Sequence, residues 1–226
     1  MVTYQFSKMT RTTRQCAVAG LMAMLVVVAS CRGSKEEGAG TVKQASGTTT
    51  PVKKFDTEHP EVLLDTSYGK ITLRLDAVNA PGTVRNFLNY VGEGFYDNTL
   101  VHYVDAGKMI LAGGYTADHK TKPILGPIRN EAHNGLKNVR GTVAMTRDPA
   151  LIDSATSQFF INLADAPHRD HQGDTADQYG YCVFGEVIEG LDAAEKISQA
   201  TTTDLGGDLV KTPDPAIVIT SARVIK

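Results

Sequence analysis

The chain has 226 residues, of which 42% are hydrophobic and 21% charged, and its formal net charge is −2. This length and apolar content suffice for one or two domains with a real hydrophobic core, which excludes a wholly disordered chain. The 21 glycines and 9 prolines fit neither a collagen-like nor a low-complexity composition. The body of the chain has no basic block, so we expect no nucleic-acid partner.

Residues 1–30 have the features of a secretory signal peptide. The first 14 residues contain three basic side chains and no acidic one, and residues 15–30 are an uncharged, mostly apolar run. This run is shorter than the roughly 20 residues that a membrane-spanning helix needs. A cleaved signal is therefore the favoured interpretation, and an uncleaved anchor is the weaker one.

The end of this run predicts a lipid anchor. The string Val28-Ala29-Ser30-Cys31 resembles the bacterial lipobox, in which a diacylglycerol is attached to the cysteine and cleavage makes that cysteine the new N-terminus. The resemblance makes Cys31 the lipid attachment site; an ordinary cleaved signal is the alternative. Arg32, rather than an aspartate, follows the cysteine. By resemblance to envelope lipoproteins, this favours the periplasmic face of the outer membrane.

Residues 31–57 predict a flexible linker. The segment is rich in Gly, Ser, Thr and Lys and nearly lacks large apolar residues, so it cannot bury enough surface to offset the entropy of ordering. We therefore divide the chain into a lipoprotein signal peptide at 1–30, the lipidated cysteine with its linker at 31–57, and a folded domain at 58–226.

The folded domain shows many short β-type runs and two helical patterns. One helix has Pro81 in its first turn, and the other follows Asp192. With no alternation of strands and helices, this pattern predicts a closed or nearly closed antiparallel barrel. Cys182 is the one cysteine in this domain, and its alternating apolar surroundings predict a buried, unreactive thiol. The β-type runs are at 61–66, 70–76, 99–104, 109–112, 141–145, 158–163, 181–187 and 216–225.

Four strings in this domain resemble the cyclophilin family of peptidyl-prolyl cis-trans isomerases, in its bacterial periplasmic branch. They are VRNFLNYVGEGFYDNTLVH, IRNEAHNGLKNVRGTVAMTR, SATSQFFINLADA and YGYCVFGEVIEGLD, and the resemblance covers essentially residues 60–225. It implies a mainly β fold: a closed eight-stranded antiparallel barrel capped by two α-helices. It also implies an enzyme that needs no cofactor and no metal, with proline-containing polypeptide segments as partners. We expect a monomer.

The chemistry of such an enzyme sets what its site must contain. An X-Pro bond rotates over a barrier of ~18–20 kcal/mol because amide resonance must be broken. The enzyme needs an apolar pocket for the proline ring and groups that hold the preceding carbonyl. It also needs a cationic donor for the prolyl nitrogen as this nitrogen becomes pyramidal.

In the family that donor is the arginine of a Phe-His-Arg string, which here is Val101-His102-Tyr103. The resemblance therefore gives Tyr103, His102 and Gln158 as the catalytic positions, with His102 as a structural histidine rather than a base.

The substrate-binding positions that the resemblance implies are partly altered. Met109 and Phe160 keep the family's residues, whereas the pocket phenylalanine is Lys108 and a glutamine is replaced by Leu111 or Ala112. The other positions implied are Thr146, Arg147, Arg169 and Tyr181.

Three of these changes add a cation where the family is mostly neutral: Lys108, Arg147 and Arg169. One hypothesis is that one of them supplies the missing charge. The other is that all three are solvated charges around a degraded pocket.

Two functions follow from this pattern. The first is an isomerase that assists the folding of exported proteins in the cell envelope. Its activity would be reduced, because the loss of one donor aimed at transition-state charge costs ~10²–10³ in rate. The second is a catalytically degenerate module that binds proline-containing or unfolded segments without turning them over.

Overall fold

The computed structural model describes residues 56–226. The predicted signal peptide, the predicted lipid site Cys31 and nearly all of the predicted linker lie outside these residues. Within the described part, no helix combines the length and the apolar character needed to cross a membrane.

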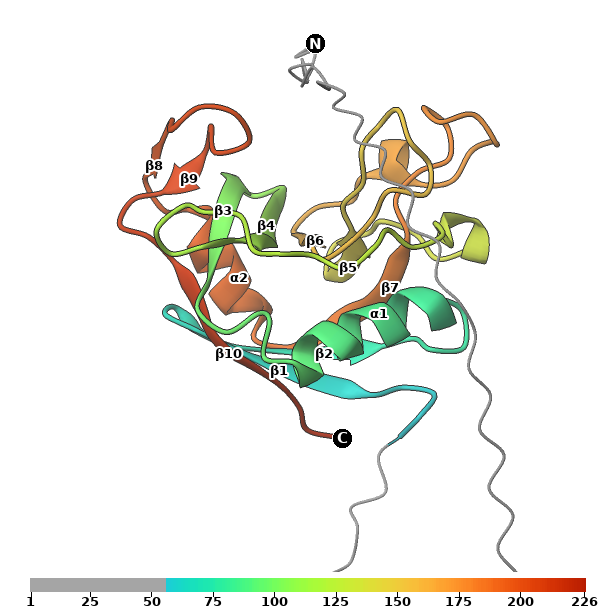
Figure 1. The fold of residues 1–226 in the computed structure, drawn as a ribbon, viewed down its shortest axis with the longest axis horizontal. Coiled ribbons are helices and arrows are strands. Elements are labelled where there is room, and N and C mark those ends of the chain that lie inside the picture. The colour runs from blue at the N-terminus through green and yellow to red at the C-terminus, as the bar shows by residue number, and fades with distance from the viewer. Residues whose placement is uncertain (1–55) are drawn as a thin grey trace, which may run out of the picture. The chain divides into compact units, whose positions relative to one another are not determined.

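The described chain folds mainly into β-strands, with two α-helices and two short 3-10 helices (Figure 1). In chain order the elements are β1 (Glu61–Thr66), β2 (Gly69–Leu75), α1 (Pro81–Gly92), β3 (Thr99–Asp105), β4 (Met109–Thr116), η1 (Ala132–Asn134), β5 (Thr142–Met145), β6 (Phe159–Asn162), η2 (Pro167–Arg169), β7 (Val183–Glu189), α2 (Leu191–Ser198), β8 (Thr202–Thr203), β9 (Thr212–Pro213) and β10 (Val218–Val224).

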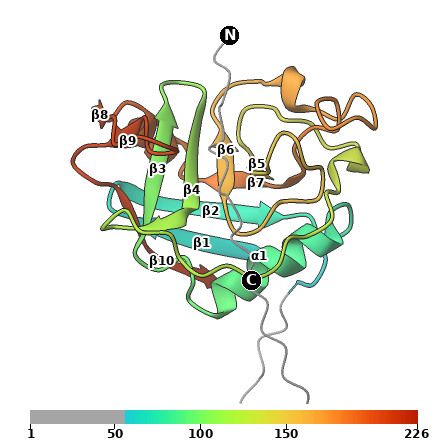
Figure 2. The same cartoon turned by 45° about the horizontal axis from the view of Figure 1, so that its top comes forward.

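Eight of these strands close into a barrel in the order β1-β10-β3-β4-β6-β5-β7-β2 (Figure 2). Every neighbouring pair is antiparallel, and β1 pairs with both β2 and β10. Closure leaves no edge strand in this eight-stranded sheet, which removes the usual site of edge-to-edge association there. Strands β8 and β9 form a separate two-stranded sheet. The prediction of a closed eight-stranded antiparallel barrel with two helices is confirmed.

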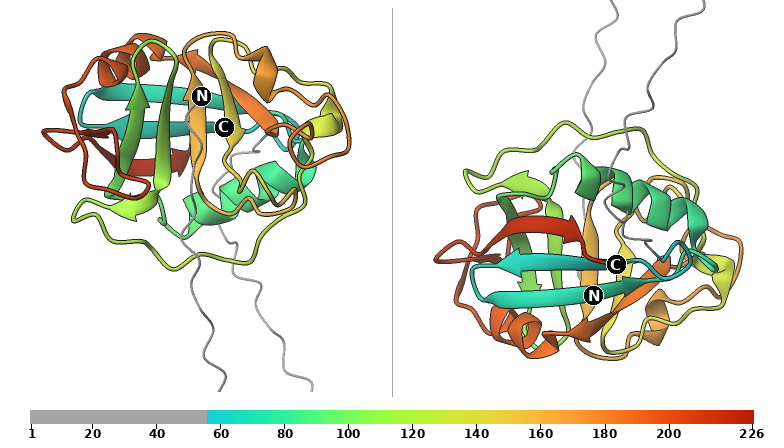
Figure 3. Two further views of the ribbon diagram at one scale, coloured as in Figure 1. Left: turned by 90° about the horizontal axis from the view of Figure 1, so that it is seen from above. Right: turned by 90° about the horizontal axis from the view of Figure 1, so that it is seen from below.

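The two helices lie at opposite ends of the barrel (Figure 3). Helix α1 begins with a proline, and its first free amides have no side-chain cap of their own. Glu131 takes that role from a distant loop, because its carboxylate accepts the backbone N–H groups of Gly82 and Thr83 at 3.1 and 2.8 Å. A carboxylate at a helix N-terminus is favourable, so this contact ties the loop before η1 to α1.

Strand β4 is longer than the sequence predicts, because it continues through Gly113 to Thr116 rather than ending at Ala112. A glycine pair usually weakens a strand, so the sequence pattern predicts an end at Ala112. The backbone requires glycine at this point: Gly113 has φ +87°, and a Cβ atom on it would lie 2.8 Å from the Ser157 carbonyl oxygen.

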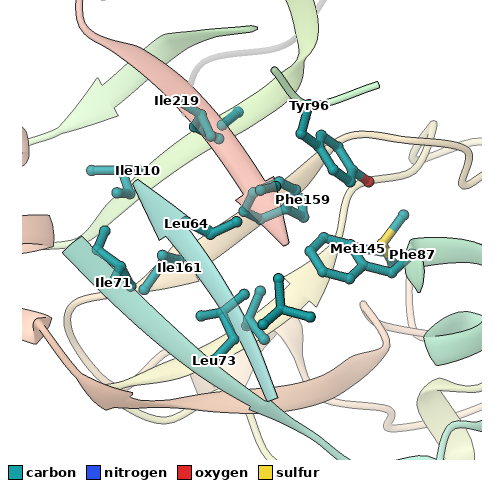
Figure 4. Close-up of a cluster of buried hydrophobic side chains, with 14 of the residues drawn as sticks. Leu64, Ile71, Leu73, Phe87, Tyr96, Ile110, Met145, Phe159, Ile161 and Ile219 are labelled. Atoms are coloured by element: carbon teal, nitrogen blue, oxygen red, sulfur yellow. The ribbon is translucent and has the colours of Figure 1, made fainter. Parts of the chain in front are cut away.

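The barrel interior is filled by large apolar side chains from the strands and from α1 (Figure 4). Phe87 of α1 packs against three rings, those of Tyr96, Phe159 and Phe184, with centroid distances of 5.1, 5.3 and 5.2 Å. The barrel strands and this core all lie within residues 56–226, so this segment contains what a domain needs to fold by itself.

The core makes a testable prediction through two leucines. Leu73 is 0% exposed and Leu151 is 59% exposed. We expect Leu73→Ala to lower the free energy of unfolding by about 2–5 kcal/mol, since the change removes buried methyl groups and leaves a cavity. The matched control Leu151→Ala should change it by less than about 0.5 kcal/mol. Urea unfolding of both variants measures this, and equal losses would contradict the assigned core.

Candidate active site

A row of outward-facing residues crosses one wall of the barrel. Tyr103 on β3 lies opposite Leu111 on β4, Leu111 lies opposite Phe160 on β6, and Phe160 lies opposite Ala144 on β5. Directly paired residues of neighbouring strands share a face of the sheet. The barrel therefore places Tyr103, Leu111 and Phe160 side by side, although 57 residues separate the first from the last.

Around this row lies a small apolar cluster that is separate from the barrel core. Its buried members are Ala144, Phe160 and Val183. Partly buried side chains surround them: Met109, Leu111, Leu136 and Tyr181. We call this set the aromatic floor, after Phe160 and Tyr181, whose rings meet nearly edge to face at 5.7 Å and 78°. The floor brings together four of the residues predicted to bind substrate: Met109, Leu111, Phe160 and Tyr181.

Arg169 lies over this floor. Its guanidinium carbon is 5.1 Å from the centroid of the Phe160 ring, close enough for a cation–π contact. One terminal nitrogen, Nη1, donates to Asn162 Oδ1 at 3.0 Å, and Nη2 lies 2.8 Å from Met109 Sδ. With Arg169 and Tyr181 around it, Phe160 is only 2% exposed. Of the three cations proposed from the sequence, Arg169 is thus the one that lies over Phe160.

Buried amides hold Arg169 in this place. The Asn162 side-chain N–H groups donate to Asn138 Oδ1 at 3.2 Å and to Thr142 Oγ1 at 3.0 Å, which leaves the Asn162 carbonyl oxygen for Arg169. Asn138 in turn donates to the Arg169 backbone carbonyl and to Asp170 Oδ1. Asn162 and Asn138 are 0% and 1% exposed, so the bonds that orient the guanidinium are shielded from water.

Tyr103 faces a different set of charges. Lys211 Nζ lies over its ring at 5.4 Å, and the same ammonium is 2.8 Å from Asp105 Oδ1. Asp105 also pairs with Lys108 at 3.3 Å. The hydrogen bond from Lys211 lowers the pKa of the Asp105 carboxyl, against the opposing effect of partial burial. The Lys108 side chain is 69% exposed, which places it at the rim beside the floor rather than in it.

Arg147 directs its hydrogen bonds to loop carbonyls. It is 7% exposed, and its guanidinium donates to four backbone carbonyls, those of Asp148, Pro149, Ala176 and Gly180. The guanidinium also lies 5.1 Å from the Tyr181 ring centroid. Its donors are thus used to fix the loop that carries Tyr181. Arg147 therefore supports the floor at Tyr181, and four of its five N–H groups donate to backbone carbonyls.

His102 and Gln158 lie at the far end of β4. The His102 ring is fully buried 4.8 Å from the Tyr115 ring, and neither of its nitrogens makes a hydrogen bond of normal geometry. Burial lowers the pKa of His102 to about 4, with Leu100, Gln158 and Asp208 acting weakly in the opposite direction. A neutral buried imidazole fits a structural residue better than a base that exchanges protons with substrate.

Gln158 packs closely against β4 and is tied to Thr146. A Cβ atom at Gly114 would lie 2.7 Å from Gln158 Nε2, so the glycine makes room for this amide. The Thr146 backbone N–H donates to the Gln158 carbonyl at 2.9 Å, while the Thr146 hydroxyl is buried and unpartnered among the described residues. The half-exposed Gln158 amide borders the barrel wall that carries the floor.

Cys182 is buried behind the floor, as predicted. Its sulfur lies 3.4 Å from the Thr83 hydroxyl, and burial raises the pKa of the thiol to about 12. Such a thiol is not a nucleophile at neutral pH. Among residues 56–226, no three His, Cys, Asp or Glu side chains are grouped as metal ligands.

Several residues of the site were not found from the sequence. Asn162 and Asn138 organise Arg169, and Lys211 covers Tyr103. The sequence did indicate a role for Asn162. A polar residue at the end of the apolar run FFIN is expected to be buried and to need hydrogen-bond partners. Lys211 gave none, since it lies 108 residues beyond Tyr103 in a loop.

Fold and floor together define a class of protein. A closed eight-stranded antiparallel barrel with a helix at each end is the cyclophilin fold. The chain belongs to the cyclophilin-type peptidyl-prolyl cis-trans isomerase family, whose sequence profile matches residues 61–224. As a member of that family it is an isomerase.

Known relatives agree with this assignment. Peptidyl-prolyl cis-trans isomerase A of Dickeya dadantii is 48% identical over 171 residues, which cover 75% of this chain and 87% of that protein. Peptidyl-prolyl cis-trans isomerase B of Escherichia coli is 44% identical over 163 residues, covering 72% of this chain and 98% of that protein. The crystal structure of a Cryptosporidium parvum cyclophilin matches the fold with a TM-score of 0.61 at 22% identity, covering 74% of this chain and 98% of that one.

The buried histidine predicts a pH dependence of stability. In the unfolded chain the imidazole titrates near pH 6.5, whereas in the fold its pKa is about 4, so the unfolded state binds the proton first as pH falls. The free energy of unfolding should therefore decrease by about 3 kcal/mol between pH 7 and pH 4 through His102 alone. Chemical unfolding of His102→Gln at the two pH values should show a smaller decrease in the free energy of unfolding, because the variant lacks the contribution of His102.

The matched control is His119→Asn, which removes an exposed histidine at a positive φ that asparagine tolerates. It should keep the full pH dependence. An NMR titration of the His102 imidazole in the unaltered protein tests the same point without a variant. A midpoint above pH 6 would contradict the assignment.

Proposed function

We propose that this chain is a monomeric prolyl isomerase that assists the folding of exported proteins from a lipid anchor in the cell envelope. The anchor faces the periplasm at the outer membrane. We further propose that its turnover is slower than that of relatives with arginine at the position of Tyr103. The observation that carries the isomerase proposal is the floor of Phe160 and Met109 beside Tyr103 and Leu111.

The chemistry follows from this geometry. The ring of a substrate proline packs on Phe160 and Met109, and the Gln158 amide holds the carbonyl before the proline as the bond rotates. Tyr103 borders the floor on the side of β3, and its hydroxyl donates as a neutral group. A neutral donor stabilises the developing lone pair on the prolyl nitrogen less than a guanidinium does. A rate lower by ~10²–10³ is the cost expected for one lost transition-state donor.

One observation supports a second function. Phe160 is only 2% exposed, with Arg169 across its face. A proline ring reaches Phe160 only after Arg169 moves, which adds a cost to substrate binding. If that cost is too large, the domain holds extended segments along its rim without turning them over.

The envelope location is supported by the sequence and by charge. Residues 1–30 have the composition of an export signal, and Cys31 ends a lipobox-like string. The linker from residue 32 to residue 55 has five basic and two acidic residues, whereas residues 56–226 have 15 basic and 23 acidic ones, a net charge of −8. Anionic headgroups attract such a linker and repel such a domain, so the barrel would stay clear of the membrane surface.

The isomerase proposal is tested with residues 50–226 and a cis X-Pro peptide whose relaxation to trans is followed in time. We expect acceleration by the unaltered domain and none by Phe160→Ala, because the proline ring then loses its aromatic partner. Tyr103→Arg should raise kcat/KM by at least about tenfold, since it restores a charged donor beside the floor. Leu151→Ala, an exposed change, serves as the control.

Two results would count against these statements. If the folded domain gives no acceleration at high micromolar concentration, the isomerase proposal fails and the binding function is favoured. An unchanged kcat/KM in Tyr103→Arg would contradict the account of slow turnover.

The anchor is tested with the full chain expressed in a Gram-negative host that is fed a labelled fatty acid. We expect label on the chain and recovery of the chain in the outer-membrane fraction, both lost in Cys31→Ser. Cys182→Ser is the matched control, because its thiol is buried, and it should keep the label. Recovery of the unlabelled, unaltered chain in the soluble periplasmic fraction would refute the anchor.

A further inference from the structure

We propose that Arg169 makes this isomerase prefer substrates in which an acidic residue adjoins the proline. This inference rests on the proposed isomerase function and names a substrate class for the same floor. It starts from a cation that lies over the floor and forms no ion pair within residues 56–226.

Arg169 forms no ion pair with a carboxylate of the described residues. Among residues 56–226, every ion pair within 4.0 Å joins other residues. The neighbouring Asp170 accepts from Asn138 and lies 3.7 Å from Lys137. Asp105 is already shared by Lys108 and Lys211. The guanidinium is half-buried, and burial is the main cause that lowers its pKa.

The local charge differs from that of the whole domain. Beside the floor lie three cations, Arg169, Lys108 and Lys211, with one carboxylate, Asp105, among them. The rim therefore has a net charge of about +2 within a domain whose residues 56–226 sum to −8. A positive site on an acidic domain favours a ligand with a negative group at this one place.

Arg169 also has donors to spare. A guanidinium has five N–H groups, and Arg169 directs one to Asn162 and one to a thioether sulfur, which is a weak acceptor. Arg147 is the contrast, because its donors are taken by four backbone carbonyls. The spare N–H groups of Arg169 can take a carboxylate by two parallel bonds, the geometry that arginine favours.

The spare N–H groups of Arg169 become important when a substrate binds. A proline ring that packs on Phe160 displaces the guanidinium from the ring and from Met109, since both now occupy the same face. The displaced group loses its cation–π contact without returning fully to water. A carboxylate on the residue beside the proline offers a new partner, whereas an amide or methyl group does not. An ion pair with an acidic substrate therefore compensates for the cation–π contact that Arg169 loses on displacement.

The experiment compares peptides that differ only in charge. Two pairs, Glu-Pro against Gln-Pro and Pro-Glu against Pro-Gln, are assayed with residues 50–226. We expect kcat/KM to favour Glu over Gln in at least one pair by about three- to tenfold at low salt, and by less at 1 M salt. Arg169→Gln should bring the ratio near one, and Arg169→Lys should keep part of it. Arg223→Gln removes an exposed arginine on β10, also without a carboxylate partner, and should leave the ratio unchanged.

Failure of the inference is distinguishable from failure of the proposed function. Turnover of all four peptides with equal kcat/KM for Glu and Gln, or a preference that survives in Arg169→Gln, overturns the inference and leaves the isomerase intact. If no peptide is turned over, the isomerase proposal fails, and binding of the same peptides by NMR then decides. Tighter binding of the Glu peptides that Arg169→Gln abolishes supports the inference, and equal binding overturns it.

Discussion

Closure of the barrel is the constraint on which the rest of the structure depends. Successive side chains of a strand point to opposite faces of the sheet. In a closed barrel, alternate residues of each strand therefore face the interior and the exterior. Phe159 and Phe160 are neighbours in the chain, yet Phe159 fills the barrel core and Phe160 forms the outer floor. A shift of β6 by one residue would exchange the two environments. The pairing that builds the core therefore also builds the site.

The positive charge that lies across the floor comes from η2. The motif resemblance predicts a catalytic cation on β3, where this chain has Tyr103, while η2 brings Arg169 over the same floor. The two positions are not equivalent. A residue on β3 stands beside the floor, whereas Arg169 lies across it and is fixed there by Asn162. The guanidinium thus covers the surface on which we propose that the substrate proline packs.

The fold was predictable because its signals are local and mutually consistent. Alternating runs gave the barrel strands to within a few residues, and Pro81 marked the start of α1. The exception, the extension of β4 through Gly113, arises from a close approach of Ser157 and Tyr96, which are distant in sequence. The motif resemblance likewise predicted four residues that the structure brings together on the floor. The different positions of the Lys108, Arg147 and Arg169 side chains could not be predicted from the sequence. Each position depends on carbonyl, amide or carboxylate partners that the fold brings close.

Strand β10 has a consequence for how the chain is made. It is the last barrel strand along the chain, and it is inserted between β1 and β3, two of the first. A growing chain that lacks β10 has two open sheet edges and cannot complete its hydrogen-bonded ring. The barrel therefore closes only after residues 218–224 have been made. Until then, the free edges of β1 and β3 stay open to pairing with another strand.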